Sequence, residues 1–266
     1  MRYSIMLSYC GEAFCGWQIQ PSDPSIQNAL QTALKTLLRR ETTVTGTGRT
    51  DTGVNAVGYT AHFDAPQGLD ARHLVCKLNA ILPDGIAVLS ISPEDGAFHA
   101  RFDAARREYT YFLHRCKDPF VERFSCMYTF PDMDFDRMNS AAALLVGTHD
   151  FSCFEKSGTD VKTSICTVGE AFWRPYTPTV SAFGIEKGAE GMYWQFRISA
   201  DRFLRNMVRA IVGTLLEVGR GKRSVQDFTS LILNPDPCRE KCSRRSSAGQ
   251  SVPGHALFLS SVDYHR

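Results

Sequence analysis

Residues 42–63 read TTVTGTGRTDTGVNAVGYTAHF, a stretch that places a polar, glycine-rich loop between two strands. The first strand is expected at 42–45, before closely spaced glycines interrupt the chain. From 57 to 63 apolar residues return at every second position, which is the period of a strand with one buried face. The polar loop is thus held between two strands.

Helices and strands alternate on both sides of this loop. Apolar residues recur at helical spacing from Ile26 to Leu38, after the capping residues Asp23 and Ser25, and Arg39-Arg40 finish the last turn. The other elements expected in this half are a strand at 3–9, a helix at 71–82 and a strand at 86–91. Together these elements predict an α+β half.

A second half echoes the first. Its expected elements are a strand at 108–114, a helix that follows Asp134 and stops at Gly147, strands at 168–173 and 192–198, a long helix at 202–218 and a last strand at 257–264. Residues 234–254, with Pro, Ser, Gly and basic residues, are expected to form a mobile loop. We therefore predict an α+β protein of two similar halves, 1–104 with the polar loop and 105–266 with the long helix.

The composition is that of an ordinary folded protein. Of the 266 residues 43% are hydrophobic and 22% are charged, which is enough for a sizeable core. No apolar run approaches the roughly 20 residues that cross a bilayer, and the first strand is too short and too alternating for a signal peptide. We expect a cytoplasmic protein without a membrane partner.

Basic residues are gathered in clusters, although the net charge is only +2. A solvated surface explains each cluster by itself, whereas four in one chain favour a polyanionic partner. The clusters are Arg101/Arg106/Arg107, Arg202/Arg205/Arg209, Arg220/Lys222/Arg223 and Arg239/Lys241/Arg244/Arg245.

The cysteines predict neither disulfides nor a metal site. There are nine, an odd number, and they are scattered without a C-x-x-C pair, so reduced structural thiols are expected. Cys238 and Cys242, with His255 beyond them, lack a fourth ligand at the spacing of a zinc finger.

The loop Gly48–Ala56 concentrates an acid, a base and hydroxyl groups within a few residues. Arg49 and Asp51 are two residues apart, so in an extended chain their side chains leave the same face and can pair. A nearby cation keeps a carboxylate ionised, which favours a nucleophile or general base over a general acid. The alternative is a surface loop in which Asp51 serves as a turn or N-cap residue.

Three arginines are in register on the helix expected at 202–218. Arg202, Arg205 and Arg209 are spaced i, i+3 and i+7 and would share one face, with apolar residues on the other. Their planar guanidinium groups suit phosphate or carboxylate recognition, although a solvated polar face is the alternative.

Aromatic residues near basic ones could stack on an extruded base. They are Phe98, Phe102, Tyr109 and Tyr111. Core packing explains most of them, and one tyrosine at a strand edge would suffice.

Several motifs follow one another along nearly the whole chain. They are Phe14–Gln20, Gly48–Ala56, Phe98–Phe102, Arg107–Tyr111, Gly147–Phe151, Phe203–Gly213 and Leu257–Tyr264. With these motifs in this order, the chain resembles the tRNA pseudouridine synthase A family. The resemblance implies two α+β halves with mixed, mainly antiparallel sheets flanking a central basic active-site cleft.

The resemblance also implies roles for single residues. Asp51 attacks or deprotonates the uridine nucleoside to start cleavage of the C–N bond, and the base then turns and rejoins through carbon. Tyr109 stacks on the flipped base, and Arg209 holds the aspartate, which would complete the pairing suggested for Arg49. Asn55 and Ala256 depart from the family, which often has His and Gly there.

The implied substrate is tRNA, at the uridine where the 3′ side of the anticodon loop enters its stem. The implied enzyme is a homodimer without a cofactor, and a nucleotide-binding glycine motif is absent from the sequence, in agreement with an isomerisation.

Two other functions compete with this interpretation. Asp51-Thr52-Gly53 also spells the aspartic-protease triplet, but such a dyad needs two aspartates and the chain has one triplet. A non-catalytic RNA-binding protein of the same fold is the other alternative. The presence of Asp51, Tyr109, Arg49 and Arg209 argues against it.

Overall fold

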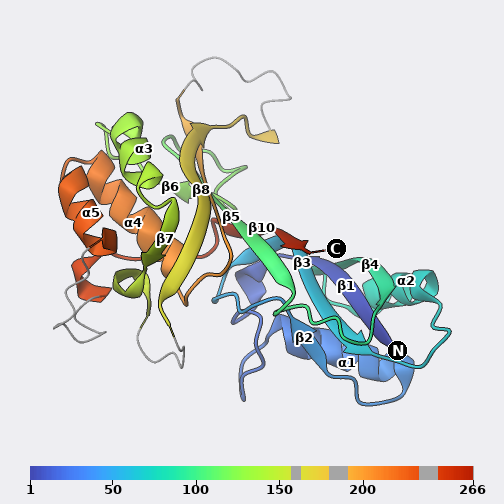
Figure 1. Ribbon diagram of the computed structural model, residues 1–266. Coiled ribbons are helices and arrows are strands. Elements are labelled where there is room, and N and C mark those ends of the chain that lie inside the picture. Colours follow the sequence, from blue (N-terminus) through green and yellow to red (C-terminus); the bar gives the residue numbers. More distant parts are fainter. Residues whose placement is uncertain (157–162, 180–190, 234–244, 266) are drawn as a thin grey trace. The chain divides into compact units, whose positions relative to one another are not determined.

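The computed structural model describes residues 1–156, 163–179, 191–233 and 245–265. The chain forms two compact units, each with strands and helices (Figure 1). The first comprises Met1–Arg107 and Phe258–Arg266, and the second Glu108–Leu257. The α+β class is confirmed. The division lies at 107/108, close to the predicted 104/105, but the last strand belongs to the first unit.

The first unit is a sheet with two helices. Its neighbouring strands, in order, are β4 (Ile86–Glu94), β1 (Arg2–Tyr9), β3 (Asn55–Asp64) and β10 (Leu257–Tyr264), and its helices are α1 (Ile26–Leu38) and α2 (Ala71–Ile81). Strand β1 is antiparallel to both neighbours, whereas β10 is parallel to β3. The short strand β2 (Val44–Gly46) pairs with β3, so the polar loop does lie between two strands.

Local sequence accounts for these elements. The alternation in β1 buries Tyr3, Ile5, Leu7 and Tyr9, each at a position that faces the core. Helix α1 begins after Ser25, whose side chain accepts a hydrogen bond from the Asn28 amide at 3.3 Å. The helix ends at Leu38 because Arg39 adopts a left-handed conformation with φ 54°.

The second unit has its own strands, and its labelled helices are close together in Figure 1. The strands, in order, are β5 (Ala104–His114, which begins in the first unit), β9 (Tyr193–Ala200), β8 (Ile165–Pro175) and β7 (Gly147–Asp150), and β6 (Cys126–Met127) pairs with β5. The helices are α3 (Phe135–Ala143), α4 (Met207–Gly219) and α5 (Val225–Leu233). Helix α5 and strands β6 and β7 have no counterpart among the predicted elements.

Helix α4 starts later than its apolar periodicity predicts. It begins at Met207, because Asn206 has a left-handed backbone (φ 65°) and its side chain donates to the Ser251 hydroxyl at 2.6 Å. Just before it, the Asp201 carboxylate accepts the amides of Thr167 and Arg202 at 2.9 and 2.7 Å. The prediction that Arg202, Arg205 and Arg209 share one helical face is therefore wrong.

The expected loop at 234–254 is partly described. Residues 245–252 lie against α4, where the Gly249 amide donates to the Thr214 hydroxyl at 2.9 Å. A Cβ atom at Gly213 would lie 1.8 Å from the Gln250 carbonyl oxygen, so glycine is required for this approach. The prediction of a mobile loop is wrong for this part, because close backbone contacts hold it. Cys238 and Cys242 lie outside the described residues.

The described cysteines, seven of the nine, are free thiols. No helix in the described ranges is long and apolar enough to cross a membrane. Within the same ranges, no three His, Cys, Asp or Glu side chains form a group that could hold a metal ion.

The buried His62 on β3 makes the stability of the first unit depend on pH. Its ring nitrogen Nδ1 accepts the Ala100 amide at 3.0 Å, which requires that nitrogen to be unprotonated. Burial lowers the pKa of His62 to about 4, with help from the charges of Arg2 and His99 and against those of Asp64 and Asp103. In the unfolded chain the pKa of this histidine is near 6.5. As the pH falls, the unfolded chain therefore binds the proton before the folded chain does.

We therefore expect the free energy of unfolding to be fully maintained above about pH 6.5 and to fall by up to about 3 kcal/mol as the pH drops to 4. Urea unfolding across this range measures the slope. His62→Asn, which keeps an acceptor but does not titrate, should flatten it, whereas His73→Asn on the exposed face of α2 should leave it unchanged. Equal slopes for His62→Asn and the wild type would contradict the assignment.

Candidate active site

Two buried tyrosines of the sheet hold the loop Gly48–Ala56 in place. Thr50 is buried, and its hydroxyl lies 2.9 Å from the hydroxyl of Tyr9 on β1. Tyr59 on β3 donates to the Gly48 carbonyl oxygen at 2.5 Å, and its ring stacks on Trp17 at 4.1 Å. Polar loop residues are thus anchored to the sheet by side chains that belong to its core.

A second motif, Phe14–Gln20, packs directly on this loop through backbone groups. The Trp17 amide donates to the Thr50 carbonyl at 3.2 Å, and the Gly53 amide donates to the Phe14 carbonyl at 3.4 Å. Gly16 has φ +90°, and a Cβ atom there would lie 2.3 Å from the Thr50 carbonyl oxygen. The two motifs therefore form one structural element, and Gly16 is needed where they meet.

Asn55 is also part of this framework. Its buried side-chain oxygen accepts the Gly11 amide at 2.8 Å. A Cβ atom at Gly11 would lie 2.3 Å from the Val54 carbonyl oxygen, so the chain at Gly11 touches the end of the loop. The residue that departs from the family pattern thus stabilises the loop in this protein.

Asp51 is presented by a tight turn of this framework. Its carbonyl oxygen accepts the Val54 amide at 3.1 Å, and Gly53 within the turn has φ 76°. Exposure alternates along the motif, since Arg49 is exposed, Thr50 is buried and Asp51 is half-buried. Asp51 is therefore a half-buried residue on a hydrogen-bonded turn, and its ion pair with Arg49 stays a prediction.

The predicted stacking residue Tyr109 lies on β5 in the second unit. It is half-buried, and its ring meets Phe203 edge-to-face at 5.1 Å and 87°. The neighbouring Glu108 is buried and accepts a hydrogen bond from Arg197 at 2.6 Å, so the strand is held beside β9. Tyr111, the other tyrosine considered for stacking, is fully buried in the core. This burial raises the pKa of its hydroxyl.

Arg209 lies in the first turns of α4, half-buried. Its Nε donates to the Val252 carbonyl at 2.7 Å, and the Val252 amide donates to the Arg209 carbonyl at 3.2 Å. The guanidinium is thereby tied on one side to the segment 245–252. Phe203, which contacts Tyr109, precedes the same helix. The motifs Arg107–Tyr111 and Phe203–Gly213 are therefore close to each other.

Arg202 and Arg205 lie in the turn before α4, where Arg205 is exposed and Arg202 half-buried. The Arg205 carbonyl accepts the Lys156 amide at 3.1 Å, so the backbone of this turn is held in place. Both arginines remain candidates for binding a polyanion, now on a turn instead of a helical face.

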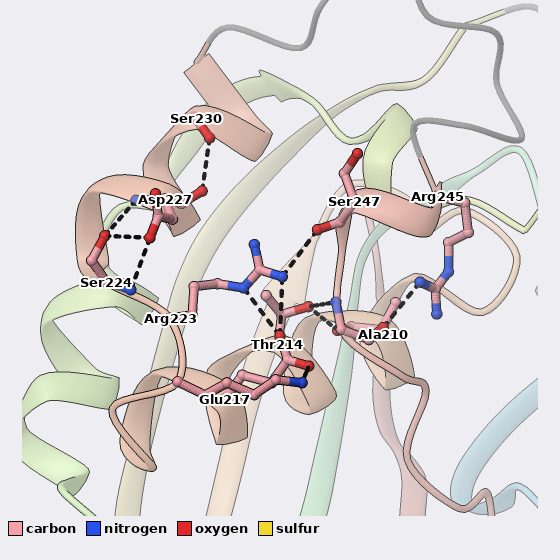
Figure 2. Close-up of polar contacts among 11 residues, drawn as sticks. Ala210, Thr214, Glu217, Arg223, Ser224, Asp227, Ser230, Arg245 and Ser247 are labelled. Atoms are coloured by element: carbon pink, nitrogen blue, oxygen red, sulfur yellow. Dashed lines mark hydrogen bonds and ion pairs between the residues drawn. The ribbon is translucent and has the colours of Figure 1, made fainter.

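In the segment 245–252, sequence reasoning missed Ser251, and it placed Arg245 in a basic cluster without finding its hydrogen bonds. Ser251 accepts hydrogen bonds from Asn206 and Arg245, both at 2.6 Å, and Arg245 also donates to the Gly249 carbonyl at 3.0 Å. Figure 2 shows Arg245 and Thr214, whose side chains bond to the carbonyl and the amide of Gly249, respectively. Gly213 and Gly249 were the available signal, because close approach of two backbones requires them.

A second support for α4 comes from Arg223. It donates to the Glu217 carboxylate at 3.0 and 3.1 Å and to the Ser247 carbonyl at 3.0 Å, as Figure 2 shows. Burial opposes ionisation of Glu217, but hydrogen bonds from Arg223 and Lys222 outweigh it and lower the pKa of this carboxyl. This part of the basic cluster Arg220/Lys222/Arg223 is therefore structural.

The site residues are divided between the units. Asp51 and Arg49 belong to the first, and Tyr109, Arg202, Arg205 and Arg209 belong to the second. In each unit the residues lie on segments fixed by backbone hydrogen bonds, as a preorganised site requires.

Comparison with known proteins identifies the family. A family model described as tRNA pseudouridine synthase matches residues 141–265. The tRNA pseudouridine synthase A of Porphyromonas gingivalis is 44% identical over 265 residues, which cover 99% of this chain and 97% of that protein. Those of Bacteroides fragilis and Bacillus subtilis are 46% and 38% identical, over 99% of this chain and 96% and 99% of theirs. The chain therefore belongs to the tRNA pseudouridine synthase A family.

Proposed function

We propose that this protein isomerises uridine to pseudouridine in tRNA, within the anticodon stem-loop. The observation that carries the proposal is the similarity to enzymes named tRNA pseudouridine synthase A along 99% of the chain. The loop that carries Asp51 supports it, because backbone hydrogen bonds hold this half-buried residue within a framework of two packed motifs.

In the proposed reaction the Asp51 carboxylate attacks or deprotonates the uridine nucleoside. The C–N glycosidic bond breaks, the base turns, and a C–C bond forms between sugar and base. The proton that leaves the carbon is balanced by one gained at the former glycosidic nitrogen. Since the product is an isomer of the substrate, the reaction consumes no oxidant or reductant, and we propose that it needs no cofactor.

The other site residues have supporting roles in this proposal. Tyr109 stacks on the flipped uracil, and Arg209 and Arg49 keep the Asp51 carboxylate ionised. The edge-to-face contact of Tyr109 with Phe203 and the hydrogen bond of Arg209 to Val252 support these roles, because they fix both side chains in advance. We further propose that the enzyme acts as a homodimer in the cytoplasm.

The test is pseudouridine formation on an unmodified tRNA transcript in metal-free buffer. We expect modification where the 3′ side of the anticodon loop enters its stem, and none in a transcript with cytidine at those positions. Peptide cleavage instead would revive the aspartic-protease interpretation. Tight tRNA binding without any pseudouridine across a tRNA pool would favour a binding protein of the same fold.

Arg205→Glu should weaken tRNA binding and reduce its dependence on salt. Each phosphate contact contributes about one unit to the slope of log K against log salt, so losing one should lower the slope by about one unit. Filter binding between low and moderate salt measures this slope. The control is Arg72→Glu on α2, an exposed arginine of the other unit that should leave it unchanged. An unchanged slope for Arg205→Glu would remove the turn before α4 from the RNA-binding surface.

A further inference from the structure

We propose that Phe102, together with His99 and Arg101, is a stacking platform for an unpaired base of the RNA substrate. The inference rests on the proposed function, because it assigns a second contact surface to the same RNA. Phe102 is 75% exposed, whereas Tyr111 of the neighbouring motif is fully buried and Phe98 is half-buried. The structure thus distinguishes aromatic residues that are close together in the sequence.

The turn that carries Phe102 is held from several strands of the first unit. The Phe98 carbonyl accepts Arg2 of β1 at 2.8 Å, and the Ala100 amide donates to His62 of β3 at 3.0 Å. The Ala100 carbonyl accepts the Tyr264 hydroxyl of β10 at 2.8 Å. These bonds fix the backbone of an exposed turn before any partner arrives, which reduces the entropy that binding would cost.

The Phe102 ring itself is held in a defined orientation. The imidazole of His99 stacks on it with ring centroids 4.3 Å apart and an angle of 30°. His99 is in turn fixed because its Nδ1 accepts the amides of Arg101 and Phe102 at 3.2 and 3.3 Å. Its own amide donates to the Asp103 carboxylate at 2.7 Å. An exposed aromatic ring is therefore backed by a second ring.

A cation accompanies the two rings. The Arg101 guanidinium carbon lies 5.7 Å from the centroid of the Phe102 ring. The Arg101 carbonyl accepts a hydrogen bond from Arg107 at 2.6 Å, so its backbone is fixed while its side chain is exposed. An aromatic face with an adjacent guanidinium provides stacking for a base and a charge for its phosphate.

The surroundings favour RNA over a protein surface as the partner. The residues that flank Phe102 in the chain, Arg101 and Asp103, are both charged and exposed. A protein interface with this ring in its centre would have to desolvate these charges. A single-stranded nucleic acid stacks on one ring and leaves its backbone phosphates near the arginines.

The experiment compares Phe102→Ala with Phe120→Ala in tRNA binding and in single-turnover pseudouridine formation. Phe120 is the matched control, a phenylalanine that is 73% exposed in the second unit. Phe102→Ala should weaken tRNA binding about tenfold, as loss of one base-stacking contact does. Phe102→Tyr should bind like the wild type, and Phe120→Ala should do so as well. Because Phe102 is 75% exposed, Phe102→Ala should unfold at the wild-type temperature.

A direct readout comes from Phe102→Trp. Stacking of a base on the new indole should quench its fluorescence when tRNA is added, while Phe120→Trp should show no such change. Wild-type affinity of Phe102→Ala overturns the inference, and so does a change confined to the oligomeric state. If the wild type forms no pseudouridine but Phe102→Ala still weakens binding, the proposed function fails and the platform stands.

Discussion

Asp51→Asn should abolish pseudouridine formation while tRNA still binds. The substitution keeps the size of the side chain and the turn of Gly48–Ala56 but removes the carboxylate that we propose attacks or deprotonates the substrate. General-base or nucleophilic groups contribute at least about 10² to 10⁴ in rate, so we expect a loss of about 10³-fold or more in the single-turnover rate constant. Tritium release or primer extension after chemical modification measures it, together with the Kd for tRNA.

The control for Asp51→Asn is Asp84→Asn. Asp84 is an exposed carboxylate of the same unit, so the change in net charge is identical and the rate should be unchanged. A tRNA affinity within about threefold of the wild type is expected for both variants, because a single carboxylate change leaves the phosphate contacts intact. Wild-type turnover by Asp51→Asn would show that another group performs the chemistry.

Gly16→Ala should both destabilise the protein and slow the reaction. The residue has φ +90°, and its new Cβ would lie 2.3 Å from the Thr50 carbonyl oxygen, a backbone atom next to Asp51. Backbone strain and overpacking together cost about 2 to 5 kcal/mol. Thermal unfolding should shift down by about 5 to 15 °C. Any relief by movement of Thr50 displaces Asp51, so kcat should fall more than the affinity for tRNA.

Two other glycines distinguish the cost of backbone strain from the cost of overpacking. Gly68 has φ +84° with open space around its Cβ position, and Gly96 has open space without the left-handed conformation. Gly68→Ala should therefore show the cost of backbone strain alone, and Gly96→Ala should show neither cost. Both should keep the wild-type rate. A Gly16→Ala variant that is no less stable than Gly68→Ala would contradict the close packing of the two motifs.

Much of the fold was predictable because its signals are local. Strand β10 was predicted at 257–264 and lies at Leu257–Tyr264, and helix α2 was predicted at 71–82 and lies at Ala71–Ile81. In both cases the period of apolar residues and the neighbouring turn or capping residues agree. Helix α5 was missed although its signal is also local, because Phe228, Leu231 and Ile232 recur at helical spacing and are buried.

The start of α4 shows where local signals fail. Arg202 and Arg205 fit helical spacing with Arg209, but Asp201 and Asn206 form hydrogen bonds to Thr167 and Ser251, far away in the sequence. With these contacts the chain forms a turn at this place, and α4 begins at Met207. The same contacts explain why residues 245–252, whose composition is that of a loop, lie against α4.

The sequence by itself determined the α+β class, most strands and helices, and the motifs that resemble the tRNA pseudouridine synthase A family, because periodicity and motif spacing are properties of the chain alone. Tertiary structure decided that Gly16 and Gly53 allow the backbone geometry of the turn that carries Asp51. It also decided that Ser251 and Val252 form hydrogen bonds with the start of α4, and that Phe102 is exposed while Tyr111 is buried. Each of these depends on contacts between residues distant in the chain, and the energy of such contacts is absent from any local pattern.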